Sequence, residues 1–340
     1  MLKQWRGVTV LLLALWAPAG MAGAAETPAR TVALAVAPVG NAWRGAMLES
    51  WRRTAEGAVR DGTVAAAPVR IAAANAIPAE AAQLRALIAE RPAAIVVDAG
   101  SPQALNDVVR QACDAGIVVV SFDGIVTEPC AYRLQYDFRR LGAAEVDALA
   151  GLLPSGGNLL EVRGVNNSDL DDAIHEGAVE ALAAHPGLRI VVAVRGGWRR
   201  GEAARTTAAV LPVMPRIDGV ITQGGDGLGV ADALAAAGRP MPAIILGNRA
   251  EELSWWKARR DAGGYRTFSI APAPGIASLA FWVAQMILDG AAVPHDVTVP
   301  LLAIEEGDLD HALAATPAGG FYSRDYTRAD AERAVAAGRP

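Results

Sequence analysis

The feature that most constrains the fold is a regular alternation of short apolar runs with longer amphipathic segments. The run IVVVSFD at 117–123 is rich in β-branched residues, which is typical of parallel strands that are buried on both faces. Helical patterns follow such runs, as at 43–60 and 79–90, and can supply the crossovers between parallel strands. The alternation starts again near residue 132. The pattern therefore predicts an α/β protein with two doubly wound, Rossmann-like lobes on parallel sheets.

Polar and aromatic residues gather where the predicted strands end. These positions matter because ligands bind beyond the carboxyl ends of the strands in doubly wound sheets. In the first half of the chain, Asn41 and Trp43 follow the first predicted strand and Asp123 follows the fourth. In the second half, the corresponding positions hold Trp198, Gln223, Asp226 and Asn248. The sequence therefore favours a ligand site between two lobes.

The first 25 residues have the pattern of a secretory signal peptide. Lys3 and Arg6 form a basic start, 8–17 is an apolar core, and the small residues at 22–25 offer a cleavage site. The apolar core is too short to span a membrane, which argues against the alternative of an N-terminal anchor. We therefore predict an exported protein that carries a cleavable signal peptide at 1–25 and does not insert into the membrane.

Composition and motifs argue against catalysis and nucleic-acid binding. The formal net charge is −5 at pH 7 and no basic cluster is present, so nothing attracts a phosphate backbone. No Gly-x-Ser-x-Gly elbow and no metal-binding histidine spacing occurs. The four histidines are scattered, at 175, 185, 295 and 311. We therefore expect no enzyme activity, no cofactor and no metal site.

Two cysteines could form a disulfide in an exported protein. Cys113 lies on a helical pattern, and Cys130 lies in the loop after the next predicted strand. An oxidising compartment would allow the two to pair. A buried Cys113 with an independent loop thiol is the alternative, and the sequence leaves both open.

The glycine-rich stretch TQGGDGLG at 222–229 superficially resembles a phosphate-binding loop. Gly224 and Gly229 have the spacing of a P-loop, but Val230 and Ala231 occupy the positions where lysine and a hydroxyl residue are required. Asp226 would also repel a phosphate at the start of the following helix. The stretch instead predicts a strand-to-helix turn at a ligand site, where either Gln223 or Asp226 reaches the ligand.

Several segments, in order, resemble the type I periplasmic binding proteins, in particular the ribose-binding-like branch that serves sugar ABC importers. The segments are TVALAVAPVGNAWRGAMLES, AAIVVDAGSPQALNDVVRQACDAGIVVVSFDG, IDGVITQGGDGLGVADALAAAGRP and AIILGNRAEEL. This resemblance implies a Venus-flytrap fold whose two lobes are joined by a three-segment hinge. It implies a first lobe of 30–136 plus 272–298 and a second lobe of 137–271 plus 299–320. The tail at 321–340 has no counterpart in the family pattern.

The resemblance also implies a set of ligand-binding residues. Asn41, Trp43 and Asp123 would line the cleft from the first lobe, and Trp198 and Asn248 would line it from the second. Tyr136, near a crossing, and either Gln223 or Asp226 complete the set. The chemistry suits a sugar-like ligand, because carboxylates and carboxamides pair with hydroxyl groups and indole rings cover C–H faces.

Two positions depart from the family pattern. Many members carry arginines where this chain has Gly124 and Ile174, so two charged donors are missing there. The acidic residues Asp169, Asp171 and Asp172 stand nearby instead, and a capping, dipole-compensating first helical turn is the favoured interpretation. If one of them faced the cleft, the ligand could be a polyol, a deoxy or amino sugar, or a cationic compound.

The resemblance thus predicts a periplasmic substrate-binding protein. Such a protein would act as a monomer, capture a small sugar-like solute and deliver it to the membrane permease of an ABC importer. The alternative is a periplasmic sensor that presents its ligand-bound state to a membrane receptor or chemoreceptor. The two uses share one fold and one movement, closure of the lobes, so the sequence does not separate them.

Overall fold

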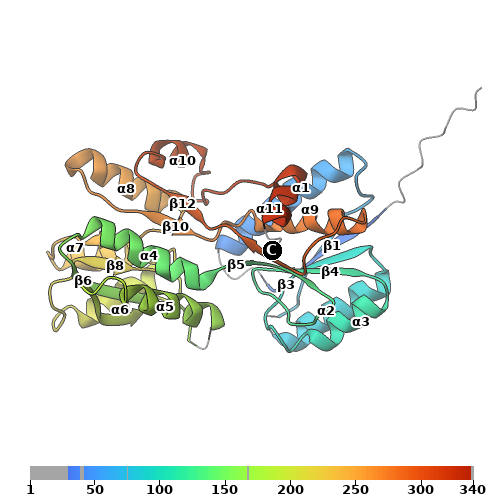
Figure 1. Ribbon diagram of the computed structural model, residues 1–340, viewed down its shortest axis with the longest axis horizontal. Helices are drawn as coiled ribbons and strands as arrows, with labels where there is room; N and C mark the ends of the chain where they lie inside the picture. The colour runs from blue at the N-terminus through green and yellow to red at the C-terminus, as the bar shows by residue number, and fades with distance from the viewer. Residues whose placement is uncertain (1–29, 39–41, 75, 167, 338–340) are drawn as a thin grey trace, which may run out of the picture.

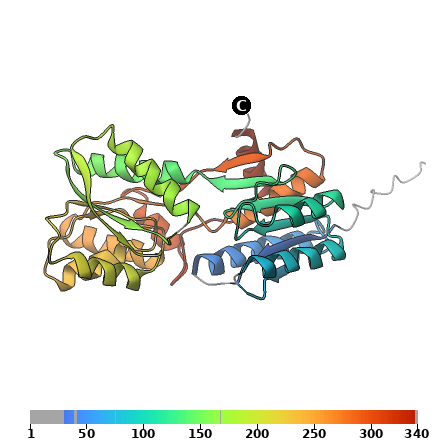
Figure 2. The same cartoon turned by 90° about the horizontal axis from the view of Figure 1, so that it is seen from below.

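The computed structural model describes residues 30–38, 42–74, 76–166 and 168–337. Within these residues, eleven helices and twelve strands form two lobes that lie side by side (Figures 1 and 2). The predicted signal peptide at 1–25 and the predicted site residue Asn41 lie outside the described residues. None of the described helices is long and apolar enough to cross a membrane.

The first lobe is built on a six-stranded parallel sheet with the strand order β11-β5-β4-β3-β1-β2. Its strands are β1 (Val32–Val36), β2 (Val69–Ile71), β3 (Ala94–Asp98), β4 (Val118–Phe122), β5 (Tyr132–Tyr136) and β11 (Asp296–Val299). Its helices are α1 (Ala42–Arg60), α2 (Ile77–Glu90), α3 (Asn106–Asp114), α9 (Ile276–Leu288) and α11 (Arg328–Ala337).

The second lobe is built on a four-stranded parallel sheet with the order β7-β6-β8-β9. A two-stranded antiparallel sheet of β10 and β12 adjoins it through a parallel bridge between Leu246 and Ser269. The strands are β6 (Gly157–Arg163), β7 (Leu188–Arg195), β8 (Gly219–Ile221), β9 (Ala243–Ile244), β10 (Ser269–Ala271) and β12 (Leu302–Ile304). The helices are α4 (Phe138–Leu152), α5 (Asp169–Leu182), α6 (Arg200–Val210), α7 (Gly227–Ala236), α8 (Ala250–Gly263) and α10 (Leu309–Ala315).

Strand β1 shows why the strands of the first lobe have continuous apolar sequences. Every residue of β1 is buried. Leu34 and Val36 pack into the core that includes α1 and α9, whereas Ala33 and Ala35 pack into the core beneath α2 and α3. Because successive side chains of a strand point to opposite faces, both faces must be apolar when helices cover both.

The chain crosses between the two lobes four times. The first three crossings follow β5, join β10 to α9, and join β11 to β12. The α/β fold with two doubly wound lobes on parallel sheets, predicted from the sequence, is therefore confirmed, whereas the residue limits predicted for each lobe remain a prediction. The fourth crossing, at 316–327, leads from α10 in the second lobe to α11, which packs against α9 in the first (Figure 1).

One disulfide lies in the first lobe. Cys113 and Cys130 are bonded, with a Cα–Cα distance of 6.4 Å. The bond joins the end of α3 to the loop between β4 and β5. Of the two alternatives left by the sequence, the disulfide is therefore the one that the structure contains.

Candidate functional site

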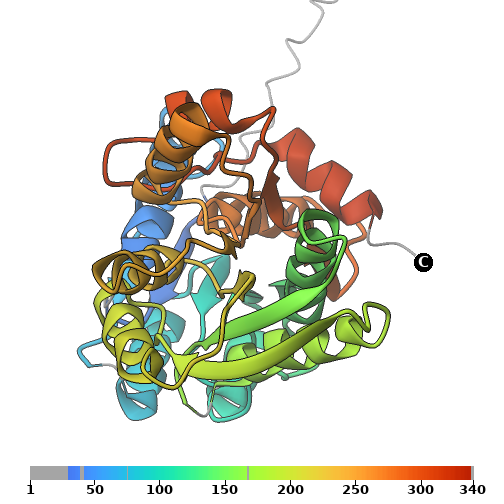
Figure 3. The ribbon, with the colours of Figure 1, turned by 90° about the vertical axis from the view of Figure 1, so that its left-hand side faces the viewer.

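The carboxyl ends of both parallel sheets lie at the boundary between the lobes. In the first lobe, β5 and β11 end where the chain leaves for the second lobe. In the second lobe, β10 runs parallel to the strand segment at Leu246 and ends where the chain returns. Figure 3, viewed from the second-lobe end, shows the first lobe behind the second. The topology therefore brings the two sets of strand ends to one region, where doubly wound folds place their ligands.

Two carboxylates and an arginine occupy this region of the first lobe. Asp98 ends β3, is buried, and accepts a hydrogen bond of 3.0 Å from Nε of Arg44 on α1. Asp123 follows β4 and is partly exposed. Burial and the nearby charge of Asp98 raise the pKa of Asp123 to about 7, although Arg44 acts in the opposite direction. The fraction of Asp123 that is ionised, and with it the ability of the carboxylate to accept hydrogen bonds, therefore changes with pH near neutrality.

Two predicted site residues, one from each lobe, share an uncommon backbone conformation. Among the described residues, only three other than glycine have positive φ: Arg91, Asp123 and Trp198. Arg91 is the C-cap of α2, a common place for this conformation. Asp123 and Trp198 have φ values of 57° and 58° and follow the ends of β4 and β7. Such backbone strain costs about 1–3 kcal/mol per residue and tends to collect at binding sites.

A hydrogen-bond network centred on Asp171 organises the second-lobe strand ends. The side chain of Asp171 is buried and accepts from Arg163 at 2.9 and 2.7 Å, from Arg195 at 2.9 Å and from the Gly164 backbone at 2.7 Å. The amide of Gln223 donates to the same carboxylate at 2.7 Å. These charge-assisted bonds hold the pKa of Asp171 at about 2, although burial alone would raise it.

The network continues to the indole of Trp198. Nε1 of Trp198 donates to the side-chain oxygen of Gln223 at 2.9 Å. A Cβ atom on Gly164 would lie 2.5 Å from two carbons of the indole, so the ring packs directly against the glycine backbone. Trp198 is partly exposed. The ring is therefore fixed in position while part of it remains open to solvent.

The acidic first turn of α5 has a second role besides the predicted one. Asp169, Asp171 and Asp172 do lie in this turn, and Ser168 is the N-cap that accepts from the Asp171 backbone. Asp172 is mostly exposed and accepts from Arg163 at 2.9 Å. Asp171, in contrast, turns inward and orients two arginines, which the capping interpretation did not anticipate.

Trp43 and Tyr136 both contact the crossing that follows β10. Nε1 of Trp43 donates to the carbonyl oxygen of Pro272 at 3.2 Å. The Tyr136 hydroxyl donates to the carbonyl of Ala273 at 2.7 Å and accepts from its N–H at 3.1 Å. Tyr136 is buried, which raises the pKa of its hydroxyl well above the usual value. These contacts favour a hinge role for Tyr136, while Trp43 remains partly exposed beside the site.

Three further predicted residues are buried within the second lobe. Gln223 is engaged by Trp198 and Asp171, as described above. Asp226 is fully buried, and burial together with the charge of Glu252 raises the pKa of Asp226 to about 8. The Asn248 amide is also buried and donates to the carbonyl oxygen of Tyr322 at 2.7 Å. In this conformation neither Gln223 nor Asp226 faces solvent, so the roles assigned to all three in ligand binding stay predictions.

The sequence analysis missed the arginines at the second-lobe strand ends. Arg163 is the last residue of β6, and Arg195 is the last residue of β7. The sequence signal was available, because an arginine followed by glycine closes each of these apolar runs. The two substituted family positions could not hold arginine here: a side chain on Gly124 would overlap the backbone of Ala99, and Ile174 is buried in the second-lobe core.

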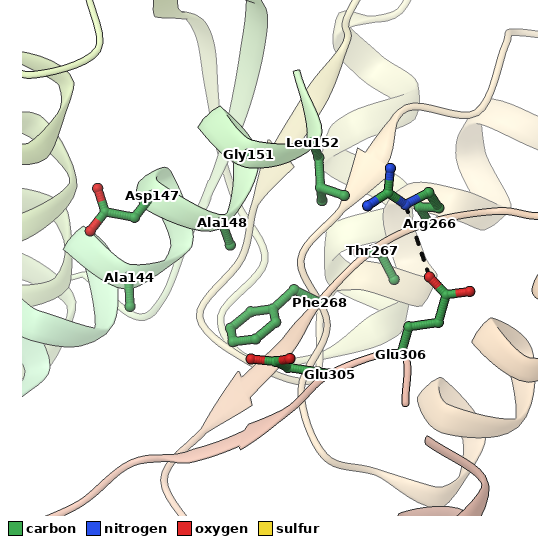
Figure 4. Close-up of a pocket in the computed structure, with 10 residues that line it drawn as sticks. All are labelled: Ala144, Asp147, Ala148, Gly151, Leu152, Arg266, Thr267, Phe268, Glu305 and Glu306. Atoms are coloured by element: carbon green, nitrogen blue, oxygen red, sulfur yellow. Dashed lines mark ion pairs between the residues drawn. The ribbon is translucent and has the colours of Figure 1, made fainter. Parts of the chain in front are cut away.

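A separate cavity of about 560 Å³ lies in the second lobe between α4, residues 266–268 and the end of β12 (Figure 4). Its lining includes the apolar side chains of Leu152 and Phe268 and several carboxylates, of which Glu306 pairs with Arg266 at 3.9 Å. None of the predicted site residues lines this cavity. The part of the chain that the structure describes also contains no group of three or more side chains suited to a metal ion.

The strand ends of two similar lobes, brought together by hinge crossings, define a two-lobed α/β binding protein. Comparison with known families makes this specific, since a family described as "periplasmic binding protein domain" matches residues 32–292. The chain belongs to the periplasmic binding protein family. No curated protein sequence matches the chain.

Solved structures with the same fold span nearly the whole chain. An ABC transporter solute-binding protein from Thermobispora bispora DSM 43833 is 32% identical, with a TM-score of 0.80 over 91% of this chain and 95% of that one. A periplasmic solute-binding protein from Actinobacillus succinogenes 130z, with bound D-allose, is 19% identical, with a TM-score of 0.70 over 83% and 99%. A solute-binding protein from Bacillus halodurans C-125, with bound myo-inositol, is 19% identical, with a TM-score of 0.72 over 84% and 97%. The last two show the fold alone.

Proposed function

We propose that the protein is the solute receptor of an ABC importer. It captures a small hydroxylated solute, a sugar or a polyol, between its lobes and delivers it to a membrane permease. The observation that carries this proposal is the pair Asp123 and Trp198, one from each lobe, both at strand ends and both in a left-handed backbone conformation. The relatives solved with D-allose and with myo-inositol support the ligand class.

Each lobe offers the proposed ligand a different kind of contact. The Asp123 carboxylate accepts hydrogen bonds from hydroxyl groups, and the exposed part of the Trp198 indole covers a face of C–H groups. Arg195 supplies a charged donor, since 40% of its side chain is exposed while one nitrogen is bound to Asp171. Arg195 thereby takes over, from another position, the role of the arginines absent at 124 and 174.

The ligand class is tested by thermal unfolding with four solutes, D-allose, arabinose, fructose and myo-inositol. A ligand that binds only the folded protein stabilises it by about 2.7 kcal/mol at a hundredfold excess over Kd, which gives a measurable rise in Tm. If none of the four raises Tm, native mass spectrometry of the purified protein identifies any retained solute. A retained solute without hydroxyl groups would refute the proposed ligand class.

The site is tested separately by titration calorimetry with whichever solute binds. Asp123→Ala and Arg195→Ala should each weaken binding by about 10- to 100-fold, since each removes a hydrogen bond to a charged group. Asp107→Ala and Arg205→Ala are matched controls, because both residues are highly exposed and their carboxylate or guanidinium groups pair only with neighbours on the same helix, α3 or α6, in the contacts described. Unchanged affinity in Asp123→Ala and Arg195→Ala would remove these residues from the site while leaving the receptor function intact.

Delivery to a permease is the step that separates an importer from a sensor. We infer that the mature protein is exported by its signal peptide, works in the periplasm and is monomeric, which size-exclusion chromatography checks directly. Deleting the gene should abolish uptake of the bound solute by the cell. Normal uptake in the deletion strain, together with a lost response to the solute, would assign the protein to a sensory receptor instead.

A further inference from the structure

The segment 316–327 connects the lobes a fourth time and lies outside the residues that match the family. It begins after α10, which packs against α8 in the second lobe, and ends at α11, which packs against α9 in the first lobe (Figure 1). The three crossings that precede it already account for the three segments of the predicted hinge. The contacts of this segment therefore require a separate explanation.

On the second lobe, the segment pairs with the chain that follows β9. Phe321 forms an antiparallel bridge with Arg249, whose guanidinium carbon lies 4.9 Å from the centre of the Phe321 ring. The Tyr322 N–H donates to the carbonyl of Asn248 at 2.7 Å, and the Asn248 amide donates back to the carbonyl of Tyr322 at 2.7 Å. Ala250 donates to Gly320 at 2.9 Å. The segment is thus held to the second lobe by an isolated antiparallel bridge and three flanking hydrogen bonds.

On the first lobe, the same segment binds the start of α9. Oγ of Ser323 accepts from the Gly275 N–H at 2.9 Å, and Oγ of Ser278 accepts from the Tyr326 N–H at 2.7 Å. The indole of Trp282 donates to the carbonyl of Tyr326 at 2.9 Å. A side chain on Gly275 would overlap the carbonyl of Arg324, so only glycine allows this approach.

Two additional contacts fix the first-lobe end of the segment and the helix that follows it. The Asp325 carboxylate accepts from Nε and Nη2 of Arg53 on α1, at 2.6 and 2.9 Å. Ala331 and Val335 of α11 are buried in the main core of the first lobe. The far end of the segment is therefore part of the first-lobe fold and cannot follow the second lobe when the lobes move.

The two sets of anchors leave almost no free chain between them. Tyr322 is bound to the second lobe and Ser323, the next residue, is bound to the first. Consecutive Cα atoms are only about 3.8 Å apart, so the segment cannot stretch when Asn248 and Gly275 separate. Any such separation must break hydrogen bonds on one side or the other.

We propose that residues 316–327 form an interlobe strap that limits the relative movement of the two lobes. The strap ties the chain after β9, at the proposed ligand site, to the start of α9 in the first lobe. Lobe opening then proceeds only by rotation that keeps Asn248 and Gly275 together. This role concerns the movement of the protein and does not depend on the identity of its ligand.

The strap is tested by pulsed electron paramagnetic resonance on the full chain without ligand. Spin labels are attached at Asp107→Cys on the first lobe and Val213→Cys on the second; both positions are highly exposed, and the two native cysteines are held in their disulfide. Gly275→Ala displaces the strap, because the added methyl group overlaps the carbonyl of Arg324. Ser278→Ala removes the hydroxyl on α9 that accepts from the Tyr326 N–H of the strap. Gly45→Ala is the matched control, because a methyl group there meets no atom within 4 Å.

We expect Gly275→Ala and Ser278→Ala to broaden the interlobe distance distribution, whereas Gly45→Ala leaves it unchanged. Amide exchange at Tyr326 should accelerate by about tenfold in Ser278→Ala, as for the loss of one hydrogen bond. If Gly275→Ala impairs folding, Ser278→Ala alone decides the question. An unchanged distribution in a folded variant with accelerated exchange at Tyr326 would overturn the proposal. Free exchange at Tyr322 and Tyr326 in the unsubstituted chain would overturn it as well.

Discussion

The two lobes share one plan but accommodate buried carboxylates differently. In the first lobe, every buried carboxylate among the described residues has a hydrogen-bond donor within reach. A donor neutralises much of the cost of burying a charge, so these groups fit the ordinary pattern of paired interior carboxylates. The pairs are Asp98 with Arg44 at 3.0 Å, Glu80 with the Gly100 N–H at 2.8 Å, and Glu128 with Arg110 at 2.7 Å.

The second lobe buries carboxylates that lack such donors. Neither oxygen of Glu145 or Asp226 has a hydrogen bond of normal geometry among the described residues, and the Trp198 backbone only partly offsets the burial of Asp226. Burial and neighbouring acidic groups raise the pKa of both carboxyls. Because an unpaired buried carboxylate is most stable in its neutral form, Glu145 and Asp226 depend on protonation, whereas the three buried carboxylates of the first lobe each depend on a nearby donor.

The largest expected effect on stability concerns Asp171, the buried carboxylate at the second-lobe strand ends that pairs with two arginines. Asp171→Ala leaves Arg163 and Arg195 without their buried partner, and losing one member of a buried ion pair costs about 3–5 kcal/mol. Urea unfolding should show this loss, and hydrogen exchange should place it in β6 and β7. Asp172→Ala is the control, because this exposed residue should contribute less than about 1 kcal/mol. Equal losses in the two variants would contradict the central role of Asp171.

The next effect belongs to the first lobe, which carries the disulfide. Replacing Cys113 and Cys130 by alanine should lower the free energy of unfolding by about 3 kcal/mol, since the bond closes a loop with a sequence separation of 17. Urea unfolding measures the loss, and hydrogen exchange should locate it around α3. Reduction of the unsubstituted protein should produce the same change. A loss of protection centred on the second lobe would show that the bond stabilises the protein by another route.

The sequence was sufficient for the fold because the fold follows local patterns. The apolar run at 117–123 became β4, and the helical pattern at 43–60 became α1, with a difference of one residue at its start. A strand that is buried on both faces must be apolar along its whole length, so the apolar run in the sequence is enough to predict the strand. The place of the strand ends was predictable for the same reason.

The site was less predictable because its geometry depends on contacts between distant residues. The Asp171 carboxylate meets Arg195, 24 residues away, and the Asn248 amide meets Tyr322, 74 residues away. No local pattern distinguishes a first-turn aspartate that caps a helix from one that turns inward to an arginine. The hydroxyl of Tyr136 likewise donates to the carbonyl of Ala273, 137 residues further along the chain, a contact that no local pattern indicates.

A smaller effect per pH unit concerns the response of stability to pH, to which the buried Asp226 of the second lobe should contribute. Because the pKa of Asp226 is raised to about 8 in the folded protein, the native state binds more protons than the unfolded state between about pH 4 and pH 8. Stability should therefore fall as pH rises through this window, by at most about 1.4 kcal/mol per pH unit from this residue. Asp226→Asn should flatten the dependence, as measured by urea unfolding at several pH values.

The control for this measurement is Asp172→Asn, which lies at the surface of the same lobe. It should leave the slope of stability against pH as it is in the unsubstituted protein. Identical slopes for Asp226→Asn and Asp172→Asn would mean that Asp226 is not the source of the second-lobe pH dependence, which would shift attention to Glu145 and Glu252.

The smallest expected effect comes from helix capping, where one helix of each lobe is compared. In the second lobe, the Asp137 carboxylate caps α4 by accepting from the Arg140 N–H at 2.9 Å, whereas the N-cap of α2 in the first lobe is Ala76, which has no capping side chain. Asp137→Ala should cost about 1 kcal/mol in urea unfolding. Ala76→Asp should stabilise α2 by up to about 1 kcal/mol, because Ala76 already has the extended backbone of an N-cap. A gain in the second of these variants without a loss in the first would show that the exposed end of α4 is held by its packing on α5 and not by its cap.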